Sequence, residues 1–75
     1  MEEKEFLIKM EEIMDLDEDT LEMDSVLEEI EEWDSLSVLS LTVFAKNTLG
    51  KILDTSTVIT FKTIRDIYNK CFGEG

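Results

Sequence analysis

The sequence predicts an all-α fold, a small four-helix bundle with three main helices, a short third helix and a long loop after the first helix. Three observations support it. Apolar residues recur at helical spacing in separate segments. Residues that commonly cap helices stand before several of these segments. The chain of 75 residues is 43% hydrophobic, which favours a single folded domain over residues 1–75 rather than a disordered acidic chain.

The first helix is expected at about residues 2–15. Its apolar residues lie at positions i, i+1, i+4, i+7 and i+8, which form one stripe, while Glu and Lys occupy the other face. The stripe consists of Phe6, Leu7, Met10, Ile13 and Met14. The acidic start of the segment suits the positive end of a helix dipole.

Residues 16–34 predict a long loop that scattered apolar residues hold to the core. These anchors are Leu16, Leu21, Met23, Val26, Leu27, Ile30 and Trp33. Ser25 and Glu28 have the spacing of a capping box, so we expect one short helical turn near residues 25–31. Long ordered loops in small domains usually serve a function or contain structure of their own.

The most apolar segment, residues 35–49, predicts a central helix, although its Val and Thr content would also allow a strand. The segment is longer than a typical strand, Asp34 and Ser35 offer a cap before it, and Gly50 offers a stop after it. Apolar residues lie on several sides of such a helix, so we expect several neighbours to pack against it. One stripe consists of Leu36, Leu39 and Val43, and it is widened by Val38, Leu41 and Phe44.

The rest of the chain predicts a short helical turn and a last helix. Ile52 and Leu53 are expected to anchor a loop to the core, and the turn is expected near residues 56–60. Thr63 caps a helix at about residues 64–72, which Gly73 ends. The apolar stripe of this helix consists of Ile64, Ile67, Tyr68, Cys71 and Phe72.

The formal net charge of −12 is unevenly distributed. Residues 1–34 contain 16 acidic and two basic side chains, whereas residues 35–75 contain three acidic and five basic ones. A chain with this much negative charge is expected to bind basic protein surfaces rather than nucleic acid or an anionic membrane. No apolar run approaches the roughly 18 residues that span a membrane. The acidic N-terminus does not resemble a signal peptide, and the single cysteine forms no intrachain disulfide, so a reducing, cytoplasmic compartment is expected.

The residue content argues against catalysis and against a metal site. The chain has no histidine, which excludes Ser-His and Cys-His catalytic pairs and zinc sites of the His-Cys type. Asp15, Asp17 and Asp19 are spaced like the start of an EF-hand loop, but Thr20 and Val26 stand where that loop needs Gly and Glu. Four of the five sulfur-containing residues are most simply core residues. They are Cys71, Met10, Met14 and Met23.

Ser35 stands at the expected start of the central helix, directly after a long loop. A hydroxyl there can carry a phosphodiester, because a helix N-terminus presents unpaired N–H groups and a positive dipole end to an anion. In the simplest alternative, Asp34 or Ser35 only caps the helix.

Residues 33–36 (Trp-Asp-Ser-Leu) resemble the attachment motif of the acyl carrier protein family, an Asp-Ser-Leu at the start of the second helix. The resemblance extends over nearly the whole chain. Residues 49–54 (LGKILD) are similar to the family's turn into the third helix, and residues 63–67 (TIRDI) to the start of its fourth. The length, the acidity and the order of these segments agree with the family.

The resemblance implies that Ser35 carries a 4′-phosphopantetheine arm from coenzyme A, which holds acyl intermediates as thioesters for fatty-acid, polyketide or related specialised synthesis. Asp34 would help the phosphopantetheinyl transferase and its metal ion engage the site. Leu36, with Trp33 of the same motif, would contact partner enzymes. The implied partners are that transferase and acyl-transferring, condensing or activating enzymes with basic docking patches. The carrier would be a monomer without catalytic activity and without a metal of its own.

The second helix departs from the pattern of fatty-acid carriers, which usually have acidic residues along it. Here that helix contains Ser37, Ser40 and Lys46. The acidic residues instead crowd the preceding loop at Glu28, Glu29, Glu31 and Glu32. We therefore expect partners to dock on this loop and on the helix start rather than along the helix. Alternatively, these glutamates form only a solvated surface.

Two other functions remain open. A peptidyl or aminoacyl carrier would differ only in its cargo, which the sequence does not determine. A non-carrier helical interaction module would use Ser35 only as a helix cap.

Overall fold

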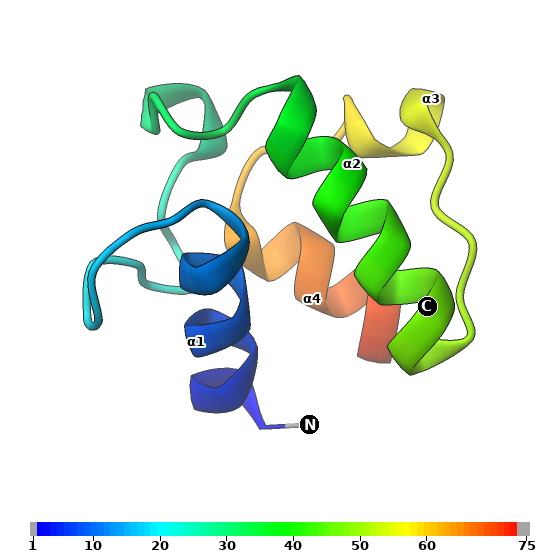
Figure 1. Ribbon diagram of the computed structural model, residues 1–75, viewed down its shortest axis with the longest axis horizontal. Coiled ribbons are helices and arrows are strands. Elements are labelled where there is room, and N and C mark those ends of the chain that lie inside the picture. The colour runs from blue at the N-terminus through cyan, green and yellow to red at the C-terminus, as the bar shows by residue number, and fades with distance from the viewer. Residues whose placement is uncertain (1, 74–75) are drawn as a thin grey trace.

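Helices surround the core of the computed structural model, which describes residues 2–73 (Figure 1). They are α1 (Glu3–Ile13), α2 (Ser35–Phe44), α3 (Thr55–Val58) and α4 (Ile64–Phe72). A 3-10 turn, η1 (Leu27–Glu29), interrupts the long loop after α1, and a π-helical segment, η2 (Ala45–Leu49), continues α2. Residues 2–73 contain no β-strand, so the predicted all-helical fold is confirmed.

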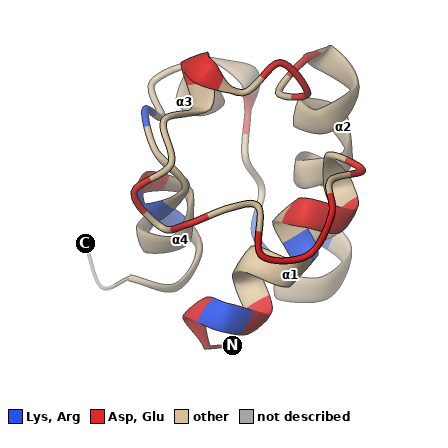
Figure 2. Ribbon diagram, turned by 90° about the vertical axis from the view of Figure 1, so that its left-hand side faces the viewer, with Lys and Arg blue, Asp and Glu red and all other residues tan. Residues whose placement is uncertain are grey.

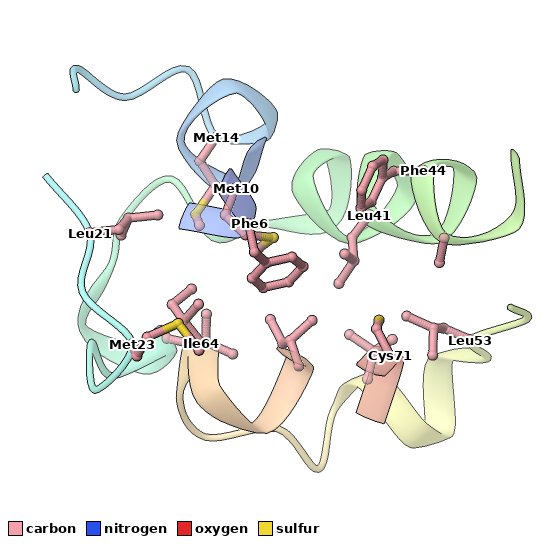
Figure 3. Close-up of a cluster of buried hydrophobic side chains, with 14 residues drawn as sticks. Phe6, Met10, Met14, Leu21, Met23, Leu41, Phe44, Leu53, Ile64 and Cys71 are labelled. Carbon is pink, nitrogen blue, oxygen red and sulfur yellow. The ribbon is translucent and has the colours of Figure 1, made fainter. Parts of the chain in front are cut away.

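One hydrophobic core holds α1, α2 and α4 together (Figure 3). Phe6 is fully buried in it, and its ring packs edge-to-face against Tyr68 and Phe72, with ring centroids 5.4 and 5.8 Å apart. The stripes predicted for the first and last helices do face this core, and the burial predicted for three methionines and the cysteine is confirmed. The buried hydrophobic residues are Phe6, Met10, Met14, Leu21, Met23, Leu27, Leu41, Phe44, Ala45, Leu53, Val58, Ile64, Ile67 and Cys71.

Helix α1 ends earlier than the predicted residue 15, because the chain turns into the left-handed conformation. Asp15 has a φ of 56°, where glycine is commoner. The Leu16 N–H donates to the Glu11 carbonyl at 2.8 Å, and the Asp15 N–H donates to the Glu12 carbonyl at 3.2 Å. These two bonds satisfy the last carbonyls of the helix and start the long loop.

One of the two apolar stripes predicted for helix α2 does not face the core. Leu41 and Phe44 are buried. The stripe of Leu36, Leu39 and Val43 faces outward, with 73%, 60% and 48% of each residue exposed. The expectation that neighbours pack against several sides of this helix is therefore wrong for this stripe. The helix is apolar on nearly all sides, so hydrophobic periodicity alone does not select its buried face.

The helical conformation extends from Ser35 to Leu49, as predicted, but its last five residues form the π-helical segment η2. Gly50 follows with a φ of 67°, in the left-handed region that an L side chain disfavours. The Lys51 N–H donates to the Ala45 carbonyl at 2.9 Å and closes this end. The predicted stop at Gly50 is confirmed.

Side chains cap both remaining helices. The Asp54 carboxylate accepts a hydrogen bond from the Thr57 N–H at 2.8 Å, so α3 begins one residue before the predicted turn. Thr63 caps α4 in a capping box with Asp66, as the sequence predicts for Thr63. Leu53 anchors the preceding loop, but Ile52 is 84% exposed and the prediction for it is wrong.

Candidate functional site

Ser35 is the first residue of α2, and its side chain is exposed. The preceding residue, Asp34, adopts an extended conformation and caps the helix: its Oδ1 accepts a hydrogen bond from the Ser37 N–H at 3.0 Å. The Asp34 carbonyl accepts the N–H of Val38 at 2.9 Å. Asp34 therefore forms the cap, and the Ser35 hydroxyl takes no part in it.

Ser37 lies on the opposite side of the same helical turn and is buried. Its Oγ donates a 2.5 Å hydrogen bond to the Glu32 carbonyl. This contact fixes the turn that leads into α2, so Ser37 orders the backbone around the site. Ser37 and Ser40, which look alike in the sequence, therefore differ in the structure: Ser37 is buried and Ser40 is exposed.

The flanking apolar residues of the motif point in different directions. The side chain of Trp33 is half-buried and packs against the core, and its backbone N–H donates to the Ile30 carbonyl at 3.1 Å. Leu36, in contrast, presents an apolar side chain to solvent beside Ser35. Of the two residues expected to contact partners, Leu36 is thus the more accessible.

The acidic cluster of the preceding loop lies next to the start of α2. Its members are Glu28, Glu29, Glu31 and Glu32, and all four are exposed. In Figure 2 most of the red follows α1 and the loop toward α2, whereas the α2 ribbon itself is tan. The backbone of this loop is held in place, because the Leu27 N–H donates to the Lys62 carbonyl at 2.9 Å and Val26 pairs with Thr63 in an isolated β-bridge.

The short helical turn expected near residues 25–31 is present as η1, but Ser25 does not cap it. Val26 precedes η1, and no side chain caps that end. The Ser25 Oγ instead accepts the Glu22 N–H at 2.8 Å, and its carbonyl accepts the N–H of Ile64 at 3.2 Å. The predicted capping box is therefore wrong, because Ser25 joins the loop to the start of α4.

Glu11 is a structurally important residue that the sequence pattern does not distinguish. It lies on α1 but is only 4% exposed. Its Oε2 accepts hydrogen bonds from the N–H groups of Thr20 and Leu21, both at 2.9 Å. A buried acidic residue is normally paired in this way, and here it secures the first half of the long loop.

An open cleft lies between η1 and the segment that joins α3 to α4. Its lining is mainly apolar, and Trp33, two residues before Ser35, forms part of it. The other lining residues are Val26, Leu27, Glu28, Ile59, Thr60, Phe61 and Lys62. A flexible group attached at Ser35 would begin close to this apolar surface.

Neither the cysteine nor the carboxylates of the described residues form an alternative site. Burial raises the pKa of the Cys71 thiol, although Lys51 partly opposes this shift, so the reactive thiolate is disfavoured. Within residues 2–73, no group of three or more His, Cys, Asp or Glu side chains is arranged to hold a metal ion. In the same range, no helix is both long enough and apolar enough to cross a membrane.

Comparisons of the chain with protein-family models, with curated proteins and with solved structures found no significant match.

Proposed function

We propose that this chain is an acyl carrier protein that is modified with 4′-phosphopantetheine at Ser35. One observation carries the proposal: an exposed serine is the first residue of a helix that Asp34 caps, within a Trp-Asp-Ser-Leu sequence that resembles the family's attachment motif. Because Asp34 satisfies the Ser37 N–H, the Ser35 hydroxyl stays available as a nucleophile.

The attachment step uses the Ser35 hydroxyl and coenzyme A. Ser35 Oγ attacks the phosphorus that bears the pantetheine unit, a new P–O bond forms, and the pyrophosphate bond of coenzyme A breaks. Adenosine 3′,5′-bisphosphate leaves, and the hydroxyl proton passes to a base of the phosphopantetheinyl transferase. By the resemblance to the family, Asp34 would also help that enzyme and its metal ion engage the site. When attached, the arm supplies a thiol that holds cargo as a thioester.

The cargo that fits the surroundings of Ser35 is an apolar acyl group. The nearby cleft presents Val26, Trp33 and Ile59, and apolar surface of this kind favours burial of a hydrocarbon chain over a charged amino acid. An aminoacyl or peptidyl cargo is the second candidate. The carrier contributes no catalytic group and raises the local concentration of its cargo at successive partner enzymes.

The proposed partners are the transferase and acyl-transferring, condensing or activating enzymes with basic docking patches. The exposed glutamates before α2 give such patches an electrostatic target that speeds association. Because the backbone of this loop is hydrogen-bonded to the segment before α4, these charges stay at the Ser35 end of the helix.

Intact-mass measurement tests the proposal directly. The chain is incubated with coenzyme A, magnesium and a broad-specificity phosphopantetheinyl transferase. We expect a mass gain of one phosphopantetheine in the wild type and in Ser40→Ala, and none in Ser35→Ala. Ser40 is the matched control because it is an exposed serine on the same helix.

The same experiment also distinguishes the carrier from the other candidate functions. If a control carrier is modified and this chain is not, the chain is a non-carrier interaction module in which Asp34 serves only as a cap. If modification succeeds, loading assays with acyl-activating and aminoacyl-activating enzymes then decide the cargo.

A further inference from the structure

Ser37 holds the three residues that precede Ser35 at both of their ends. Its Oγ donates a hydrogen bond to the Glu32 carbonyl at 2.5 Å, and its backbone N–H donates to Asp34 Oδ1 at 3.0 Å. Both acceptors belong to residues 32–34, which we call the entry turn because they lead directly into α2.

The hydroxyl bond of Ser37 joins two segments of the chain. Ser37 is the third residue of α2, whereas Glu32 lies in the loop before the cap residue Asp34. Only 4% of Ser37 is exposed, so a hydroxyl that lost the Glu32 carbonyl would have little access to water as a replacement. The hydrogen bond is therefore a strong constraint on the entry turn.

Packing holds only the middle of the entry turn. The side chain of Trp33 packs against the core, and its backbone N–H donates to the Ile30 carbonyl at 3.1 Å. The side chains of Glu32 and Asp34, in contrast, are exposed, so packing does not orient them. The direction in which the chain enters Ser35 is therefore set mainly by the two hydrogen bonds of Ser37.

Two groups of the attachment site depend on the geometry of the entry turn. Asp34 is its last residue, and the nucleophile Ser35 follows directly. Ser35 Oγ has to approach the phosphorus of coenzyme A in line with the bond that breaks. A misplacement of about 1 Å can slow such a step by about a hundredfold.

We propose that Ser37 is a positioning residue for the modification of Ser35. Through the entry turn it sets where the Ser35 hydroxyl and the Asp34 carboxylate stand toward the transferase and coenzyme A. This inference rests on the proposed function. Because Ser37 is buried, it acts through Glu32 and Asp34, so its loss should slow the chemical step more than it weakens binding of the carrier.

The test measures kcat and KM of the broad-specificity transferase with coenzyme A, with the chain as the varied substrate. We expect Ser37→Ala to lower kcat by about tenfold or more and to leave KM within about twofold. Ser37→Thr keeps a hydroxyl and should restore most of kcat. If Ser37→Ala is unfolded by circular dichroism, Ser37→Cys replaces it, because a thiol is only a weak donor.

Gly50→Ala is the matched control for a general loss of stability. Gly50 follows the other end of the same helical segment, and a Cβ there meets no atom within 4 Å, but its φ of 67° makes the substitution strained. At a temperature where circular dichroism shows all variants folded, Gly50→Ala should leave kcat and KM within about twofold of the wild type.

Each other outcome identifies which inference fails. If Ser37→Ala is modified with the kcat of the wild type, or if only KM changes, the positioning role is wrong while the proposed function stands. If Gly50→Ala is slowed as much as Ser37→Ala, or if a folded Ser37→Thr is as slow as Ser37→Ala, the hydroxyl bond is not the cause and the proposal is overturned. If the wild type is not modified at all, the proposed function fails and the positioning role falls with it.

Discussion

Glu11 orders the first half of the long loop through a single carboxylate oxygen. Oε2 accepts the N–H groups of both Thr20 and Leu21, and the side chain is buried. Those two N–H groups belong to a segment without regular secondary structure, so they have no helix or strand partner to replace the carboxylate. Removal of the carboxylate would leave them unsatisfied near the core.

We predict that Glu11→Ala lowers the free energy of unfolding by roughly 2–4 kcal/mol, because two hydrogen bonds to a charged acceptor are lost. Glu11→Gln should cost less, since its amide oxygen can still accept both N–H groups. Urea denaturation measures both values. The control is Glu12→Ala, which removes an exposed neighbour whose carboxylate pairs with Lys9. Equal losses for Glu11→Ala and Glu12→Ala would contradict the anchoring role.

At the scale of secondary-structure elements, Asp66 stabilises the start of α4. Its Oδ2 accepts the N–H groups of Lys62 at 2.9 Å and Thr63 at 3.1 Å. These backbone hydrogen bonds, that of Lys62 first, lower the pKa of Asp66 below its ordinary value of 3.8. The same segment accepts the Leu27 N–H, so the cap also supports the acidic loop.

The lowered pKa of Asp66 predicts a defined pH dependence. The ionised carboxylate stabilises the folded chain fully above the ordinary pKa of 3.8, and this contribution is lost as the pH falls through the lower pKa of the folded state. We expect the wild type to be more stable than Asp66→Asn at neutral pH, with the difference shrinking at acid pH. Denaturation of both proteins across this pH range provides the measurement. A difference that stays constant with pH would show that ionisation of Asp66 does not contribute.

Gly50 ends the helical segment through its backbone conformation and not through lack of space. A Cβ built at this position meets no atom within 4 Å, but φ is 67°. We predict that Gly50→Ala lowers the free energy of unfolding by about 1 kcal/mol, the cost of the left-handed conformation, and that Gly50→Asn costs less. Urea denaturation of both variants tests this. If Asn costs as much as Ala, the left-handed conformation is not the cause.

The sequence predicted those elements whose apolar residues recur on one face. The stripes of α1 and α4 and the cap at Thr63 are of this kind. It did not predict which face of α2 is buried, because that helix is apolar on several sides. Glu11 resembles any acidic residue on a polar helix face, and only tertiary contact with Thr20 and Leu21 distinguishes it. Ser35 could be singled out from the sequence, whereas the buried contact of Ser37 with Glu32 could not.

At the scale of the whole molecule, the negative charge is balanced by few ion pairs. Residues 2–73 contain three, of which Arg65 forms two, with Glu3 at 3.6 Å and Asp24 at 3.2 Å. All the side chains involved are at least 38% exposed, so each pair contributes little to stability. We therefore expect repulsion among the many other acidic side chains to outweigh these attractions.

We predict that sodium chloride stabilises the protein. Raising the concentration from about 0.02 M to about 0.5 M shortens the Debye length and screens the repulsion, so the melting temperature should rise by about 5 °C. The matched variant replaces Glu28, Glu29, Glu31 and Glu32 with Gln. It should have a higher melting temperature than the wild type at low salt, and added salt should raise that temperature less, because part of the repulsion is already gone.

Thermal unfolding followed by circular dichroism measures both proteins. A melting temperature that falls with salt would mean that the exposed ion pairs outweigh the repulsion, and an unchanged salt response in the variant would place the repulsion elsewhere in the chain.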